Sequence, residues 1–343
     1  VLIVQWGSVL RWEIRTKLFL RTAEFYWHEG HTAHVSAEEA KEEMYRILDI
    51  YEDFCLKEAA IPVIKGTKSE VEKFPGAQVT TSIEAMMWDK RALQSGTSHY
   101  FGQNFAKAFE IQYLDSNNTL QFCETTSWAI SSRIIGALIM VHGDDQGLVL
   151  PPRLAPVQAV IVPIFKTPEE KVKVMEVADR IFKELKAAGI RLKMDDRDNV
   201  SSGFKFNDWE MRGVPLRIEV GPKDVEKGSV ALARRDRPGR EGKSFVPQAG
   251  LDSTVSLLLS EIQDSLLKRA TEYRDANIHD PKDYEELKKV VQNGWAFSYW
   301  CESRECETKV KEDAKATTRN IPLNQPDTEG TCIVCGKPSK RKV

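Results

Sequence analysis

The sequence has no long hydrophobic run. Within its 343 residues no apolar stretch reaches the roughly 18 to 20 residues that a membrane-spanning helix needs. The first residues, Val1 to Trp6, carry neither the basic region nor the small-residue cleavage site of a secretory signal, and the chain has no initiator Met. Because these residues read as the inside of a strand, we expect the true start to lie upstream.

An excess of charge of one sign is also absent. The formal net charge is −2, from 49 basic and 51 acidic residues. Nothing global therefore indicates a nucleic-acid partner, and any contact with RNA must come from a local patch.

Cysteine is scarce, and its distribution is uneven. Cys55 and Cys123 stand alone, as expected of buried thiols, whereas the other four of the six lie in the last 43 residues. Their spacing is that of two pairs, Cys301-x4-Cys306 and Cys332-x2-Cys335, which predicts a four-thiolate structural zinc site with no open position for catalysis. Reduced surface thiols are the alternative. A metal site without a secretory signal favours a cytoplasmic protein.

The pattern of residues 1 to about 150 predicts a largely antiparallel sheet with a helical layer. Strand-like runs occur at 9–14, 109–114 and 120–123. One long helix interrupts them, and Ser36 with Glu39 predicts a capping box at its start.

From about 155 the pattern becomes that of a compact α/β domain. The apolar run 157–162 predicts a strand covered on both faces, and Thr167-Pro168-Glu169-Glu170 predicts the start of a helix that ends at Gly189. Further strands are predicted at 190–194 and 214–220, and further helices at about 204–211 and 253–275. The apolar-poor stretch 311–330 is expected to be a solvent-exposed loop.

Two arginines near the start are candidates for binding phosphate. A hairpin would bring Arg11 and Arg21 to one site, where guanidinium groups suit a triphosphate, although surface arginines on a hairpin are the alternative. The string from His28 to His31 is not a zinc-protease motif, because that motif has two residues between Glu and the second His.

Four blocks carry a family resemblance. Arg-Trp-Glu at 11–13, Phe-Leu-Arg-Thr at 19–22 and Trp-His-Glu-Gly-His at 27–31 resemble motif 2 of class II aminoacyl-tRNA synthetases in its prolyl form. The block 94–105 resembles the most specific signature of that enzyme, 127–136 resembles motif 3, and 142–153 is also characteristic. Since the similarity reaches the cysteine-rich tail, the chain is identified as a member of the prolyl-tRNA synthetases of the eukaryote- and archaeal-like type.

The resemblance implies an α+β and α/β multidomain protein. We expect part of the antiparallel-sheet catalytic domain at 1–152, an α/β anticodon-binding domain at 153–255 and a small zinc-binding domain at 256–343. The basic stretch 223–243, with Arg234, Arg235 and Arg237, either faces the phosphates of the anticodon stem or is solvated surface.

The implied function is that of a ligase in protein biosynthesis. It activates L-proline with ATP and magnesium and transfers the prolyl group to tRNA-Pro. The alternative is a catalytically silent RNA-binding or scaffold homologue, against which the intact Arg11, Arg21, His99 and Arg133 argue. A different class II synthetase is disfavoured by the block Thr97-Ser98-His99.

Site residues follow from the matched motifs. Arg11 and Arg133 are the implied catalytic residues. The implied ATP ligands are Arg11, Glu13, Arg21, Thr22, Gln94, Thr97, Ser131 and Arg133, and the implied proline ligands are Arg11, Phe25, Trp27, Glu29, His31 and His99.

Nothing before Arg11 resembles motif 1, which forms the dimer interface in the family. We therefore expect a homodimer of the full-length protein, and we expect the chain as written not to activate proline by itself.

Overall fold

The computed structural model describes all residues from Val1 to Val343 and divides into two compact units. The first unit comprises Val1–Lys57, Ile61–Val141 and Thr271–Val343, and the second comprises Glu58–Ala60 and His142–Ala270. None of the helices combines the length and the apolar composition that crossing a membrane requires.

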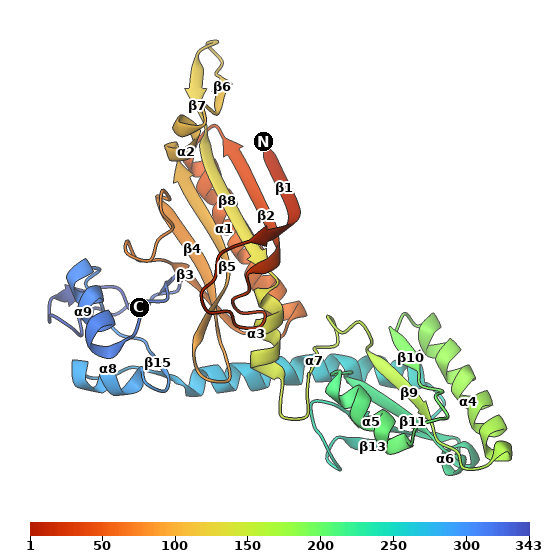
Figure 1. The fold of residues 1–343 in the computed structure, drawn as a ribbon. Helices are drawn as coiled ribbons and strands as arrows, with labels where there is room; N and C mark the ends of the chain where they lie inside the picture. Colours follow the sequence, from red (N-terminus) through yellow and green to blue (C-terminus); the bar gives the residue numbers. More distant parts are fainter. The chain divides into compact units, whose positions relative to one another are not determined.

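A seven-stranded sheet forms the centre of the first unit (Figure 1). In spatial order its strands are β1 (Leu2–Leu10), β2 (Glu24–His34), β8 (Glu124–Ser131), β5 (Ala92–Gly102), β4 (Val79–Met86), β3 (Val63–Thr67) and β16 (Ile321–Pro322). Every neighbouring pair is antiparallel. The predicted antiparallel sheet is therefore confirmed.

Helix α1 (Ala37–Asp53) supplies the predicted helical layer. Its N-cap is Ser36, whose hydroxyl accepts a hydrogen bond from the backbone N–H of Glu39. The Glu39 carboxylate pairs instead with the ring of His34, at 3.1 Å. Met44 of the helix is fully buried in a cluster with Tyr100 of the sheet. One turn of π-helix, η1 (Phe54–Glu58), follows.

Two predicted strands of the first unit differ from the structure: the strand expected at 9–14 lies earlier, at Leu2–Leu10, and the one expected at 109–114 is shorter. Strand β1 ends at Leu10, and Arg11 begins a loop that a bridge between Lys17 and Arg21 closes. Residue Phe109 completes the last turn of α2 (Asn104–Ala108) by donating to the carbonyl of Phe105. The hairpin after it is short, and its strands are β6 (Gln112–Leu114) and β7 (Leu120–Phe122).

The second unit is the predicted α/β domain. Its five-stranded sheet has the order β10 (Leu192–Met194), β9 (Ala159–Pro163), β11 (Leu216–Val220), β12 (Ser229–Arg234) and β13 (Lys243–Pro247). Strands β10, β9 and β11 are parallel to one another, β12 is antiparallel to β11, and β13 is antiparallel to β12. Its helices are α4 (Pro168–Ala187), α5 (Ser202–Met211), α6 (Pro222–Lys227) and α7 (Leu251–Ala276), which runs on into the first unit. The capping box of α4, between Thr167 and Glu170, is confirmed.

Two of the arginines expected at an RNA surface are held inside the second unit. Arg235 is only 4% exposed, and its guanidinium lies 2.5 Å from the carboxylate of Asp144. Arg234 pairs with Asp236 at 2.8 Å. Both alternatives, facing tRNA phosphates and solvated surface, are wrong for Arg235, because it is buried and paired with a carboxylate. Arg234 is partly buried and also paired, whereas Arg237 lies in an exposed bend.

The C-terminal part of the first unit is a module of short elements. They are β14 (Ile278–His279), α8 (Tyr284–Val290), β15 (Trp295–Ala296), α9 (Arg304–Ala314), β16, β17 (Gly330–Thr331) and β18 (Pro338–Ser339). The stretch 311–330 is not the exposed loop that its composition predicts. Ile321 is 6% exposed, and β16 pairs with β3 and forms the edge of the seven-stranded sheet. Its few apolar residues suffice because backbone pairing, which composition does not reveal, holds it.

Candidate active site

A cavity of about 1020 Å³ lies in the first unit, over strands β2, β5 and β8 and the loop that follows β1. Each of the residues predicted for the nucleotide and amino-acid site lines it: Arg11, Glu13, Arg21, Thr22, Phe25, Trp27, Glu29, His31, Gln94, Thr97, His99, Ser131 and Arg133. The structure therefore brings together residues that are more than 120 positions apart in the sequence.

Alternation along the strands explains this convergence. Phe25, Trp27, Glu29 and His31 are spaced by two on β2, so their side chains share one face of the sheet. Antiparallel pairing sets Trp27 opposite Ser131, and the neighbouring strand β5 brings its own alternating row. Residues that belong to separate motifs in the sequence therefore lie on one face of the three neighbouring strands β2, β8 and β5.

One end of the cavity is cationic. The guanidinium of Arg11 lies over the rings of Phe25 and Trp27, 5.1 and 5.8 Å from their centroids. Arg133 begins helix α3 (Arg133–His142) and donates to the carbonyl of Gln94 at 3.3 Å. Burial lowers the pKa of Arg133, and the positive charge of Arg11 lowers it further. Guanidinium groups this close together are suited to binding an anion that carries several negative charges.

The loop between β1 and β2 adds a third arginine to this end. Arg21 donates to the carboxylate of Glu13, with 2.5 Å between Nε and the oxygen. Leu20 of the same loop accepts a hydrogen bond from Arg133 Nε at 3.0 Å. The loop is therefore tied to α3 by the same arginine that faces the cavity.

The other end is aromatic and holds a neutral histidine. His99 is 8% exposed, and burial lowers its pKa to about 4. Its Nδ1 lies 3.1 Å from the hydroxyl of Thr80, and its ring lies 4.9 Å from that of Phe74. Nearby on β2, Glu29 lies 3.3 Å from the ring of His31. A carboxylate beside aromatic rings suits a small cationic ligand.

Sequence reasoning missed the strand that supports these residues. Thr80, Ser82 and Glu84 alternate on β4 directly opposite site residues of β5, and all three are buried. Polar residues at every second position of the strand, alternating with mostly apolar residues, are the signal that indicates them. Phe74 of the cavity wall was also missed, because it lies in a loop that has no periodic pattern.

The four C-terminal cysteines converge. The sulfurs of Cys301, Cys306, Cys332 and Cys335 all lie within 4.8 Å of one another, and Cys301 is 3.6 Å from both Cys306 and Cys335. Tetrahedral coordination with zinc–sulfur bonds of about 2.3 Å places sulfurs ~3.8 Å apart. The donor set therefore fits a tetrahedral thiolate metal site. Cys55 and Cys123 are buried elsewhere, as predicted.

Three family descriptions match the chain in order. "tRNA synthetase class II core domain (G, H, P, S and T)" matches residues 2–142, "Anticodon binding domain" matches 158–245, and "Prolyl-tRNA synthetase, C-terminal" matches 284–343.

Relatives resemble the chain over its whole length. The chain is 56% identical to a proline–tRNA ligase of Roseiflexus castenholzii, covering 100% of this chain and 72% of that protein. It is 49% identical to the chloroplastic/mitochondrial proline–tRNA ligase of Arabidopsis thaliana, covering 99% of this chain and 63% of that protein.

Crystal structures of prolyl-tRNA synthetase from Cryptosporidium parvum are also similar. The complex with halofuginone and AMPPNP matches with a TM-score of 0.95 at 39% identity, covering 100% of this chain and 71% of that one. The complex with L-proline and AMP matches with a TM-score of 0.92 at 41% identity, covering 100% of this chain and 73% of that one.

Proposed function

Because this chain belongs to the prolyl-tRNA synthetase family, we propose that its cavity activates L-proline with ATP before the prolyl group passes to tRNA-Pro. The chain is a proline–tRNA ligase with a class II catalytic core. The observation that carries the assignment of the cavity is that a cationic end and an aromatic end with a carboxylate share one space.

The chemistry of the first step suits this arrangement. The proline carboxylate attacks the α-phosphorus of ATP, the bond to the β-phosphate oxygen breaks, and prolyl-adenylate and pyrophosphate form. No nucleophilic side chain is needed, so catalysis is positioning and charge neutralisation. Arg11 lies where it reaches both reactants, because it stacks on Phe25 and Trp27 while facing the cationic end.

The proposed ATP ligands divide the nucleotide among them. Arg133 and Arg21 bind the triphosphate, together with magnesium brought by the nucleotide, and Arg11 binds the α-phosphate. Glu13 and the backbone at Thr22 hold the adenine, and Gln94, Thr97 and Ser131 complete the site. Support comes from their shared lining of the cavity and from the AMPPNP bound by a relative of 39% identity.

The proposed proline pocket is formed by Phe25, Trp27, Glu29, His31 and His99. The Glu29 carboxylate pairs with the ammonium of proline, and the aromatic rings enclose the pyrrolidine ring. His99 stays neutral at physiological pH, because burial lowers its pKa to about 4, and so it does not repel that ammonium.

We also propose one structural zinc ion, held by Cys301, Cys306, Cys332 and Cys335. The metal supplies cross-linking of the C-terminal module and takes no part in the reaction, because four thiolates leave no open position. The prediction of a cytoplasmic protein rests on this use of cysteine and stays a prediction.

A homodimer is the proposed assembly. Strand β1 is an edge of the sheet and exposes large apolar side chains, among them Leu2 at 69%, Trp6 at 80% and Leu10 at 78%. An exposed apolar edge of this kind favours association with a second chain. Light scattering of the full-length protein tests this.

Charging of tRNA tests the function as a whole. The full-length protein is expected to attach radiolabelled proline to tRNA-Pro in the presence of ATP and magnesium. A protein that binds tRNA but forms neither prolyl-adenylate nor prolyl-tRNA would support the alternative, a catalytically silent scaffold.

A further inference from the structure

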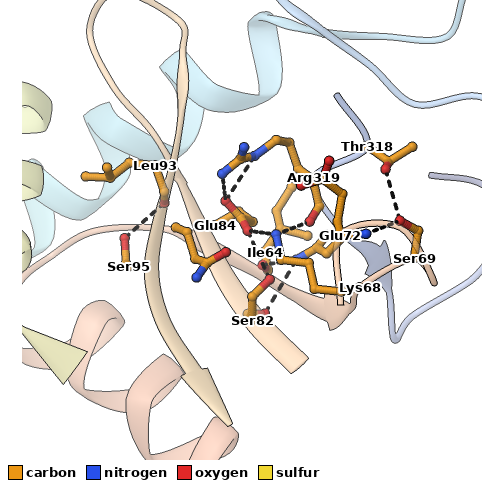
Figure 2. Close-up of polar contacts among 12 residues, drawn as sticks. Ile64, Lys68, Ser69, Glu72, Ser82, Glu84, Leu93, Ser95, Thr318 and Arg319 are labelled. Carbon is orange, nitrogen blue, oxygen red and sulfur yellow. Dashed lines mark hydrogen bonds and ion pairs between the residues drawn. The ribbon is translucent and has the colours of Figure 1, made fainter. Parts of the chain in front are cut away.

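Figure 2 shows a buried ion cluster around Glu84. Glu84 is the cross-strand partner of Gln94, whose carbonyl accepts a hydrogen bond from Arg133 at the cationic end of the cavity. The carboxylate of Glu84 on β4 is fully buried and accepts hydrogen bonds from Ser82 Oγ at 3.0 Å, from Lys68 Nζ at 2.6 Å and from the guanidinium of Arg319 at 2.9 Å. Lys68 directly follows β3, and Arg319 comes from the C-terminal module, 235 positions after Glu84. Parts distant in sequence thus meet at one carboxylate.

This carboxylate lies at an irregularity of the sheet. The register of β4 and β5 pairs Ile83 with Gly96 but Glu84 with Gln94, so Ser95 is the extra residue of a β-bulge. Bulges bend a strand and re-aim its side chains. Gln94 directly precedes this bulge, and its carbonyl accepts the hydrogen bond from Arg133. The placement of two proposed ATP ligands therefore depends on how β4 is held at Glu84.

The two ends of the cavity have separate supports on β4. Thr80 is paired with His99 and contacts its ring, which belongs to the proposed proline pocket. Glu84 is paired with Gln94, which belongs to the proposed ATP site. A change confined to the Glu84 cluster should therefore disturb ATP more than proline.

Further contacts place Arg319 firmly. The side chain of the next residue, Asn320, donates to the carbonyl of Ile64 on β3 at 2.9 Å. The hydroxyl of Ser69 donates to Glu307 of α9 at 2.7 Å. Lys68 also donates to the backbone carbonyl of Arg319. The segment that carries Arg319 is therefore itself hydrogen-bonded to the catalytic sheet, and this holds the guanidinium next to Glu84.

We propose that Arg319 is a positioning residue for ATP: it acts through Glu84 on Gln94, the residue that directly precedes the bulge. The inference rests on the proposed function of the cavity as an ATP site. A buried carboxylate with two cationic partners stays where both can reach it, and loss of one partner frees β4 to shift. The C-terminal module is then a part of the nucleotide site, although none of its residues lines the cavity.

The test is calorimetric binding of AMPPNP and of L-proline to the full-length protein. Arg319→Met keeps the apolar stem and removes the charge. It is expected to weaken AMPPNP binding about tenfold and to change proline binding by less than about twofold. Arg319→Lys restores a charge and should recover most of the affinity. Arg341→Met is the matched control, because Arg341 is in the same module and pairs only with Glu302, at 3.4 Å. It should bind both ligands like wild type.

A second variant asks whether Arg319 acts through Gln94. Gln94→Ala removes the side chain but keeps the carbonyl that accepts from Arg133, so in this background Arg319→Met is expected to weaken AMPPNP binding by clearly less than the tenfold that it causes alone. A purely structural role would lower the fraction of protein that binds without changing either affinity, and that result would overturn the proposal. So would equal weakening of both ligands, or full additivity with Gln94→Ala. Wild-type protein that binds both ligands yet forms no prolyl-adenylate would contradict the proposed function and leave this inference standing.

Discussion

The indole of Trp128 occupies the space that a side chain at Gly30 would fill. The two residues are direct partners across β2 and β8, and a Cβ added to Gly30 would lie 2.1 Å from the indole ring. Gly30 stands between Glu29 and His31, whose side chains point to the opposite face, into the cavity. The glycine therefore lets the proposed proline pocket form above a packed tryptophan.

Gly30→Ala is expected to destabilise the protein by about 1–3 kcal/mol, the usual range for overpacking, and to raise the KM for proline. Thermal unfolding and exchange kinetics measure both effects. Gly7→Ala is the matched control, because a Cβ there meets nothing within 4 Å. Unchanged stability and KM in Gly30→Ala would contradict the role given to this contact.

The two ends of the cavity should separate in kinetics. His99→Ala is expected to raise the KM for proline far more than the KM for ATP. Arg133→Ala should do the reverse, because it removes a charge-assisted phosphate contact worth roughly 1.5–3 kcal/mol. The measurement is ATP–pyrophosphate exchange with each substrate varied in turn. Equal effects on both substrates would refute the assignment of the two ends.

Metal content tests the cysteine cluster. The purified protein should hold one zinc ion per chain, and Cys332→Ser should lose the ion and lower the thermal stability of the C-terminal module. Cys123→Ser should retain the ion, since this buried thiol is not among the four clustered sulfurs. A protein without zinc by elemental analysis, with the module still folded, would show that the sulfurs hold no metal.

Acid should destabilise the second unit through His142. This side chain is 2% exposed and lies 3.0 Å from the carbonyl of Ala59, and burial lowers its pKa to about 4. Between pH 6.5 and about 4 the unfolded state binds the proton more tightly, so stability falls as pH falls through this window, by about 3 kcal/mol in all.

His142→Gln keeps an N–H donor but cannot be protonated in this range. Calorimetric melting at several pH values should show a smaller loss of stability between pH 6.5 and 4 than in wild type. Val141→Ala, which removes no titrating group, should keep the slope of wild type. The same dependence of stability on pH in His142→Gln and in wild type would contradict this role of His142.

Local signals predicted much of this structure. The N-cap residues Ser36 and Thr167 are where the sequence indicates them, because a capping hydroxyl needs only a backbone N–H three residues on. The residues that line the cavity were identified through the resemblance of their motifs to a known family, not from local signals alone.

The parts that failed depend on partners far away in the chain. Arg235 looks like a surface charge until Asp144, 91 positions earlier, is brought beside it. The stretch around Arg319 reads as a loop in the sequence, because its partners, Glu84 and strand β3, lie more than 200 positions earlier. A buried ion cluster has no periodic pattern of its own, and only the folded sheet reveals it.

Amino-acid dependence of ATP–pyrophosphate exchange tests the central claim most directly. The full-length protein, supplied with ATP, magnesium and each of the twenty amino acids in turn, is predicted to incorporate labelled pyrophosphate into ATP strongly with L-proline and weakly or not at all with the others. Exchange that is absent with proline, or that is faster with another amino acid, would contradict the account.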